Sequence, residues 1–330
     1  MKTNTLSLFL LVLCPSLGIG IPSTHSQDLL PPGPPGPTMK TLVQVEPGTP
    51  ISSIPFTIDQ AGFYYLTDNQ TGINGSHGIL INSSNVLLDL HGFSLQGVSG
   101  SLDGISITAE SNVTVLNGSI SGWGGNGISG IAPYSRFENL QTVDNALAGF
   151  VGEGTGSLFQ NCVSRQNSSG FYLSGALCVL DKCSAVANGG VGFEPFPDAN
   201  FTSCAAIKNV SHGFSLLGGG AIVDKSFSAN NLERGFRGFD VTFTGSVARD
   251  NGSTGILANQ GTVRDCRAYR NAGNGIDCAR SVVSNCTARE NSVYGFEAIG
   301  GIIKNCVSEG NTTGQYHILQ GALGIENWQP

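Results

Sequence analysis

Apolar and polar residues alternate in short runs, and from Gly78 onward these runs return at a regular spacing. A Gly followed by Phe or Ile recurs from Gly127 to Gly295 at intervals of 22, 21, 22, 21, 22, 20, 20 and 20 residues, and looser copies stand at Gly78 and Gly104. Self-similarity at such a period indicates a repeat architecture, in which each unit buries its apolar face against its neighbours.

Four further columns keep phase with the repeated glycine. One column is Asn, three or four residues before the glycine: Asn145, Asn167, Asn188, Asn209, Asn231, Asn251, Asn271, Asn291 and Asn311. Five residues before each Asn stands mostly Cys or Ser, with a large apolar residue three positions earlier and a small residue two positions later. Independent columns in phase over nine units predict ladders of like side chains, including an Asn ladder and a Cys ladder.

Each unit predicts strands and turns. It is rich in Gly, Asn and Ser, has no run of helix formers, and its apolar residues alternate at period two. About 20 residues suffice for three short strands, and successive coils would stack at the inter-strand spacing of about 4.8 Å. Parallel strands joined within one sheet cross over right-handedly. We therefore expect an all-β fold, a single right-handed parallel β-helix of roughly eleven coils.

The Asn is expected at a turn, where its side chain can satisfy backbone groups of the next coil and a left-handed conformation is tolerated. The repeated Gly would then permit a close turn.

The chain outside the repeats predicts export. Lys2 and the short apolar run Leu6–Leu13 resemble a signal peptide, with cleavage after Ser26. Cys14 could carry a lipid anchor, although the bulky Leu13 before it disfavours this. We expect a secreted, periplasmic or cell-envelope protein. The predicted organisation is a signal peptide at 1–26, a Pro/Gly-rich linker at 27–38, an N-terminal cap at 39–72, β-helix repeats at 73–313 and a C-terminal cap or tail at 314–330.

Charge is unevenly distributed along the chain. The net charge is −7, but residues 27–224 hold 5 basic and 14 acidic side chains, whereas residues 225–304 hold 10 basic and 7 acidic ones. This profile is not that of a nucleic-acid-binding protein. No later segment is apolar enough to predict a membrane span. Solvated loop edges would also explain the asymmetry.

Several stretches resemble the parallel β-helix repeats of the pectin-lyase-like superfamily, in particular a group of exported bacterial β-helix proteins. The matching stretches are Pro55–Ile58, Gly62–Thr67, Asn85–Leu95, Gly118–Gly127 and coils such as Asn285–Arg289, within residues 39 to 325. The resemblance implies the fold. For function it leaves open polysaccharide lyases and hydrolases, phage spikes and non-catalytic proteins.

Enzymes of that superfamily use clustered Asp residues, a Ca²⁺ site with a basic residue, or His/Tyr pairs, and the sequence shows none of these sets complete. The best candidates follow the inward Phe or Ile of each repeat and should face outward: Glu194, Arg237, Asp277 and Glu297. Asp277 and Glu297 would be neighbours on adjacent coils, where like charges raise one pKa and could make an acid/base pair. A solvated face of mixed charge is the alternative. His212 precedes a repeat glycine and is expected in a turn.

A second outward column lies three residues after the Cys column and contains Arg249, Tyr269 and Arg289 on three successive coils. Guanidinium groups beside an aromatic ring suit carboxylated sugars, through bidentate pairing and stacking. The alternative is Arg stems that cover apolar atoms.

Eight cysteines follow the predicted signal peptide, and six share the ladder column. Parallel Cβ atoms about 4.8 Å apart are farther apart than a disulfide prefers, so we expect buried free thiols. Disulfides remain the alternative, since exported proteins favour them. No metal-ligand spacing and no cofactor motif is present.

The leading hypothesis is a non-catalytic exported β-helix scaffold that binds polysaccharide, with acidic polysaccharide as the expected partner. The alternative is a polysaccharide lyase or glycoside hydrolase, and an adhesin-like spike is a third class. The sequence does not indicate an oligomeric state.

Overall fold

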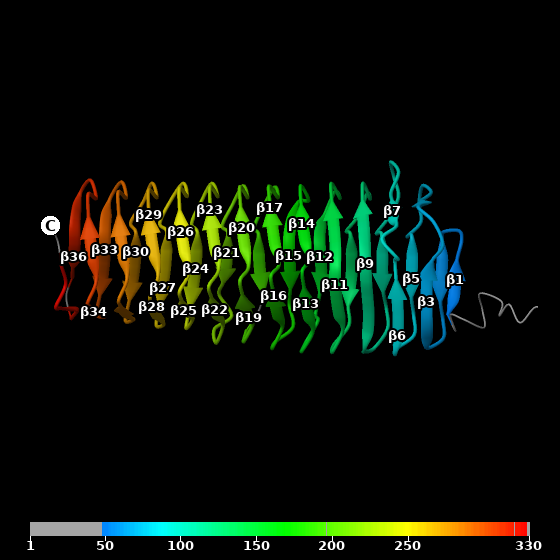
Figure 1. Ribbon diagram of the computed structural model, residues 1–330, viewed down its shortest axis with the longest axis horizontal. Helices are drawn as coiled ribbons and strands as arrows, with labels where there is room; N and C mark the ends of the chain where they lie inside the picture. Colours follow the sequence, from blue (N-terminus) through cyan, green and yellow to red (C-terminus); the bar gives the residue numbers. More distant parts are fainter. Residues whose placement is uncertain (1–47, 196, 320, 329–330) are drawn as a thin grey trace, which may run out of the picture. The chain divides into compact units, whose positions relative to one another are not determined.

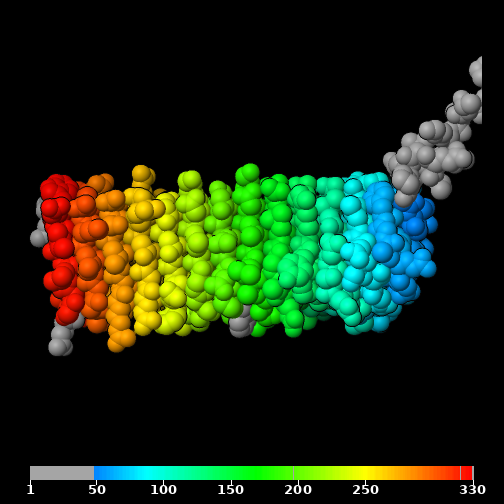
Figure 2. All heavy atoms as spheres, turned by 90° about the horizontal axis from the view of Figure 1, so that it is seen from below, coloured from blue at the N-terminus to red at the C-terminus, as the bar shows by residue number. Residues whose placement is uncertain are grey.

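The computed structural model describes residues 48–195, 197–319 and 321–328, which belong to one compact unit. The predicted signal peptide and the linker at 27–38 lie outside the described residues. Every described strand pair is parallel and the described residues contain no helix, so the chain forms an all-β parallel solenoid. The coils follow one another along a single axis (Figure 1), and in the space-filling view they form successive bands (Figure 2).

One face of the solenoid is a 13-stranded sheet to which each coil contributes one strand. Thirteen coils are close to the roughly eleven predicted. The strands are β2 (Phe56–Ile58), β5 (Ile79–Ile81), β8 (Ile105–Ile107), β10 (Ile128–Ile131), β12 (Ala148–Gly152), β15 (Ser169–Leu173), β18 (Phe193–Pro195), β21 (Phe214–Leu216), β24 (Phe236–Phe239), β27 (Ile256–Asn259), β30 (Ile276–Ala279), β33 (Tyr294–Ile299) and β36 (Gly314–Ile318).

The remaining strands form two ladders that the long strands β9 (Val113–Ser121) and β11 (Arg136–Val143) join into one 24-stranded sheet. The first ladder also holds β1 (Thr49–Ile51), β3 (Gly62–Leu66), β6 (Val86–Asp89), β13 (Leu158–Gln160), β16 (Val179–Asp181), β19 (Asn200–Thr202), β22 (Ile222–Asp224), β25 (Thr242–Thr244), β28 (Thr262–Arg264), β31 (Val282–Ser284), β34 (Ile302–Lys304) and β37 (Leu323–Ile325). The second ladder also holds β4 (Gln70–Thr71), β7 (Ser94–Gln96), β14 (Val163–Arg165), β17 (Ser184–Val186), β20 (Ala205–Ile207), β23 (Phe227–Ala229), β26 (Val247–Arg249), β29 (Arg267–Tyr269), β32 (Thr287–Arg289) and β35 (Val307–Glu309).

Strand pairing continues across both predicted cap boundaries. Strands β2 and β3 pair with β5 and β6 across residue 72, and β33 and β34 pair with β36 and β37 across residue 313. The cap and repeat limits themselves stay predictions.

Period-two alternation points one column of each strand into a narrow core. The inward columns hold the predicted aromatic and aliphatic residues, and Phe150, Phe171, Phe193, Phe214 and Phe236 stack with centroids 4.7 to 4.9 Å apart. Such burial of apolar area is the main favourable contribution to folding.

The predicted Cys column forms a buried ladder at the corner between the two ladders of the large sheet. All eight cysteines of the described residues are buried and free. The Cys204 thiol donates to the Leu180 carbonyl at 3.2 Å, and the hydroxyl of Ser246, in the same column, donates to the Thr244 carbonyl at 3.1 Å. Ser can replace Cys at positions 226 and 246 because either group can donate to a carbonyl oxygen at this corner.

The Asn column forms the predicted buried ladder, with one difference at the turn. Asn271 Oδ1 accepts the Asn251 backbone N–H at 3.2 Å and its Nδ2–H at 2.9 Å, so each Asn satisfies its neighbouring coil. However, the left-handed residue is the one before the Asn: Asp250 has φ 54° and Arg270 φ 53°. An αL residue at that position turns the chain and leaves the Asn side chain inside.

The repeated glycine is required for a different reason than the predicted close turn. Gly255 and its equivalents do not have a positive φ. A Cβ built on Gly255 would lie 2.6 Å from Asn271 Nδ2 and 2.7 Å from the Gly275 carbonyl oxygen. Glycine is therefore needed for the close approach of the next coil and not for the turn.

Candidate functional site

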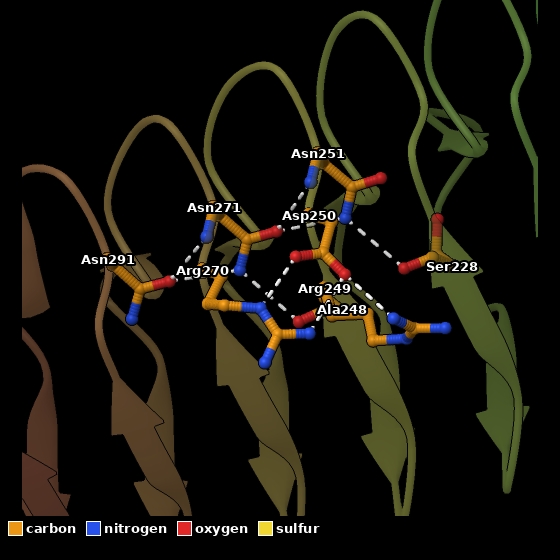
Figure 3. Close-up of polar contacts among 8 residues, drawn as sticks. All are labelled: Ser228, Ala248, Arg249, Asp250, Asn251, Arg270, Asn271 and Asn291. Carbon is orange, nitrogen blue, oxygen red and sulfur yellow. Dashed lines mark hydrogen bonds and ion pairs between the residues drawn. The ribbon is translucent and has the colours of Figure 1, made fainter.

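The Asn ladder fixes a row of exposed turn side chains beside the second ladder of the large sheet. Asp250 and Arg270 each precede a ladder Asn, so their side chains leave the turn at the same place on adjacent coils (Figure 3). Asn251 Nδ2 donates to the Ser228 carbonyl at 3.2 Å, and Asn271 Nδ2 to the Ala248 carbonyl at 3.2 Å. A rigid turn therefore positions the charged groups that follow.

The three predicted ligand-binding residues form one register column. Arg249 pairs with Tyr269, and Tyr269 pairs with Arg289, on β26, β29 and β32. We call Arg249, Tyr269 and Arg289 the basic stripe. A shallow cavity of about 410 Å³ lies over β29 and β32, and it is lined by Arg267, Ala268, Tyr269, Arg270, Thr287, Arg289 and Glu290. We call it the stripe cavity; Arg249 lies outside its lining.

The guanidinium groups of this region are mostly paired with acids. Asp250 accepts from Arg249 Nη1 at 2.8 Å and from Arg270 Nε and Nη2 at 2.8 and 3.1 Å (Figure 3). These hydrogen bonds, that of Arg270 first, hold the pKa of Asp250 below its usual value. Arg289 Nε contacts Glu309 Oε2 at 3.1 Å. The sequence column alone gave no sign of these partners.

Two of the arginines also lie over aromatic rings. The Arg249 guanidinium carbon is 5.2 Å from the centroid of Phe227, and that of Arg270 is 4.9 Å from the centroid of Tyr269. Both distances suit cation–π contacts. One face of the Tyr269 ring is therefore occupied by Arg270, which limits the sugar stacking expected from the sequence.

The predicted catalytic residues lie on the outer face of the 13-stranded sheet but do not converge as a set. Ser215, Arg237, Leu257, Asp277 and Glu297 are consecutive register partners. Leu257 therefore separates Arg237 from Asp277.

Glu194 lies further back along the sheet, on β18. It lines a different cavity of about 270 Å³ together with Pro195, Ser215, Leu217 and Gly218. Of the four predicted residues, only Asp277 and Glu297 are neighbours.

The structure adds His317, which sequence reasoning missed. His317 pairs in register with Glu297, and its Nδ1 is 3.0 Å from Glu297 Oε1. Its ring stacks on Tyr294 with centroids 4.4 Å apart. We call Asp277, Glu297 and His317 the acid row. His317 lies 20 residues after Glu297, the interval of the preceding coils, but Gln315 takes the register place of the repeat glycine Gly295. A column counted from Gly314 therefore misses His317.

Asp277 and Glu297 have unlike surroundings. Burial first, and the charge of Glu297 second, raise the pKa of Asp277 to about 6, while Arg234 opposes the rise. Like-charge proximity, the cause proposed from the sequence, is therefore the smaller one. Glu297 Oε2 accepts from Asn274 Nδ2 while Oε1 contacts His317. Asp277 can therefore hold its proton up to about pH 6, beside a second carboxyl that is held by hydrogen bonds.

A third group surrounds His212, in the turn before β21, three coils from Asp277. His212 Nδ1 is 3.0 Å from Glu233 Oε2 and its Nε2 is 3.4 Å from Arg237 Nη1. Burial lowers the pKa of His212, and Arg237 and Arg234 lower it further against the effect of Glu233. Arg234 Nε is buried without a hydrogen-bond partner in the structure.

Within the described residues, no group of three or more His, Cys, Asp or Glu side chains could hold a metal ion. In the same part of the chain, no helix has the length and apolar character needed to cross a membrane.

The chain matches the family model "Right handed beta helix region" over residues 74–232 and 199–327. It belongs to this family, and the handedness expected from the crossover rule is confirmed. Comparison with curated protein sequences found no match.

Solved structures with the same fold include a mutant of the periplasmic alginate epimerase AlgG, with 14% identity, a TM-score of 0.61 and coverage of 78% of each chain. The A-module of the Azotobacter vinelandii mannuronan C-5 epimerase AlgE6 matches with 13% identity, a TM-score of 0.57 and coverage of 86% of this chain and 90% of that one. The A-module of AlgE4 from the same organism has 14% identity, a TM-score of 0.55 and coverage of 82% and 87%. At these identities the likeness establishes the fold, the one expected from the resemblance to pectin-lyase-like proteins.

Proposed function

We propose that this protein is an exported scaffold that binds an extended acidic polysaccharide along the basic stripe. The observation that carries the proposal is the stripe cavity, where Tyr269 and Arg289 meet Arg267 over two adjacent coils. Its size is within the range of small-ligand sites. Solved proteins of this fold include epimerases of alginate and mannuronan, which supports an acidic glycan as the ligand class.

The geometry suits a chain that runs parallel to the solenoid axis. Arg249, Tyr269 and Arg289 recur at one position per coil, so successive carboxylates can meet successive coils about 4.8 Å apart. Each exposed contact contributes about 1 kcal/mol or less, so affinity should be modest and should fall as salt rises.

An extracytoplasmic location is part of the proposal. It rests on the apolar leader predicted at residues 1–26, and the periplasmic AlgG of the same fold supports it.

Binding of oligomannuronate to the purified protein at low and high salt tests the proposal. We expect the wild type to bind, and the double variant Arg249→Ala, Arg289→Ala to lose binding with little change in melting temperature, because both side chains lie outside the core. The control is the double variant Arg264→Ala, Arg280→Ala, which removes the same charge at other corners. Equal loss of oligomannuronate binding in both double variants would indicate a general effect of positive charge and would contradict a specific role of the basic stripe.

A second candidate function, a polysaccharide lyase or glycoside hydrolase, is favoured by the acid row. Asp277, with a pKa of about 6, could donate a proton, and Glu297, held by His317 and Asn274, would be the second carboxyl group. Glycosidases that retain configuration need carboxyl groups about 5 Å apart, a separation that neighbouring coils can supply. Arg237 and Glu194 would lie outside this pair.

Turnover on a panel of uronate and neutral glycans separates the two functions. Product formation that Asp277→Asn abolishes would make the protein an enzyme. Binding without product would leave the scaffold function.

A further inference from the structure

Arg267 differs from the other arginines around the stripe cavity. It is exposed at the start of β29 and lines the cavity, and it forms no ion pair with any described residue. Its register partner on the next coil is Thr287, whose hydroxyl lies in the same cavity. The guanidinium of Arg267 is therefore free to donate two hydrogen bonds to an external carboxylate.

Arg249 and Arg270, in contrast, already share one acid. Asp250 binds both guanidinium groups, Arg270 through two nitrogens and Arg249 through one. The same two groups lie over the rings of Phe227 and Tyr269. Asp250 compensates one of their two positive charges, and contacts within the protein fix the orientation of both groups.

The walls of the stripe cavity carry unlike chemistry. Arg267 and Arg289 supply positive charge, and besides the Nε that lies 3.1 Å from Glu309 Oε2, Arg289 carries two Nη groups that can donate. Glu290 supplies a carboxylate that can accept from hydroxyl groups, and Thr287 supplies a hydroxyl. A ligand that satisfies these walls needs both an anionic group and hydroxyl groups.

We propose that the stripe cavity is a subsite for one uronate unit, with Arg267 as the residue that takes the sugar carboxylate and Asp250 as a positioning counter-ion. This inference rests on the proposed binding of acidic polysaccharide and refines it: Arg249, the outermost stripe residue, contributes least. Asp250 holds Arg249 and Arg270 and so weakens the attraction of these two guanidinium groups for an arbitrary polyanion. This favours a ligand that also has hydroxyl groups, from which Glu290 can accept hydrogen bonds.

The test compares single variants against two probes, oligomannuronate and dextran sulfate, over a salt series. Arg267→Gln should weaken oligomannuronate binding by roughly fivefold and Arg249→Gln by less than about twofold, as expected for losing one free and one compensated exposed charge contact. Asp250→Asn should strengthen dextran sulfate binding several-fold and steepen its salt dependence, because two guanidinium groups are released. Asn accepts the left-handed conformation at this turn, so the fold should persist.

Asp265→Asn is the matched control. Asp265 is also a left-handed corner Asp, with φ 56°, and pairs with its neighbour Arg264 at 3.5 Å, but Arg264 does not line the cavity, whereas Arg270, the partner of Asp250, does. The Asp265→Asn variant should bind oligomannuronate and dextran sulfate with the same affinities as the wild type. If the wild type binds oligomannuronate and Arg249→Gln weakens binding as much as Arg267→Gln, the subsite is wrong while the proposed function stands. If Asp250→Asn leaves dextran sulfate binding unchanged, the counter-ion role is wrong. If the wild type binds no oligomannuronate, the proposed function and the subsite fail together.

Discussion

The coils of β12 to β21 and those of β27 and β30 solve the same packing problem with different side chains. In the earlier coils the inward position after the repeat glycine is Phe, and Phe159 and Phe201 meet this stack edge-on. In the later coils Ile256, Val263, Ile276 and Val283 take the equivalent places and are fully buried.

Coil length changes at the same point, and the structure shows where. The corner between the 13-stranded sheet and the first ladder spans five residues after β21, from Leu217 to Ala221, but only two after β27, Gln260 and Gly261. The inward residue just before this corner is Leu216 on β21 but the smaller Ala258 on β27. A shorter corner therefore accompanies a smaller core, and the 22- and 20-residue intervals are two solutions to one cross-section.

The difference extends to the outer surface. Strands β18 and β21 share one register pair, whereas β24 with β27, β27 with β30 and β30 with β33 share four each. Equal corners keep outward columns aligned from coil to coil. The acid row and the stripe cavity both lie on these regular coils, so uniform coil length supplies the alignment that a repeating ligand would require.

The largest expected effect is on the aromatic stack. Phe214 lies 4.7 Å from both Phe193 and Phe236 and meets Phe201 edge-on at 5.5 Å. Phe214→Ala should lower the free energy of unfolding by about 3–5 kcal/mol, through lost burial and an unfilled cavity. Ile276→Ala is the comparison and should cost less. Chemical denaturation of both variants measures this, and a larger cost at Ile276 would show that the aliphatic coils carry the stability.

The repeat itself was predictable from the sequence because the core columns recur without exception over many coils. The Asn ladder, the Cys column and the outward position of Asp277 all follow from period and phase. Features that depend on single residues did not follow. Gln315 replaces the repeat glycine in the coil of His317, so the glycine column does not point to His317, and the contacts of Asp250 with two arginines depend on a turn conformation that the Asn column does not reveal.

The next effect concerns pH and is confined to the regular coils. Since burial raises the pKa of Asp277 to about 6 in the folded state, from its ordinary value of 3.8, the folded protein binds the proton more tightly than the unfolded chain. Stability should therefore fall as pH rises from about 4 to about 6. Asp277→Asn should remove this loss and stabilise the protein at pH 7.5 by about 2 kcal/mol, allowing for partial exposure.

Melting temperatures of wild type and Asp277→Asn across pH 4 to 8 measure the difference. Glu110→Gln provides a control carboxyl on an earlier coil, away from the acid row. Parallel pH curves for wild type and Asp277→Asn would contradict a raised pKa at this position.

The smallest expected effect is at the Cys ladder, which both kinds of coil share. Cys286 Sγ donates to the Ser284 carbonyl at 3.1 Å and accepts the Cys266 N–H at 3.4 Å. In the neighbouring Ser coils, Ser226 Oγ makes the same two contacts with the Asp224 carbonyl and the Cys204 N–H, at 3.0 and 3.2 Å. Cys286→Ser should therefore change the free energy of unfolding by less than about 1 kcal/mol. Cys286→Ala should cost more, because it leaves the Cys266 N–H without its acceptor. If thermal denaturation shows Cys286→Ala to be more stable than Cys286→Ser, burial of an apolar group governs this column, and not the hydrogen bonds that Cys and Ser share.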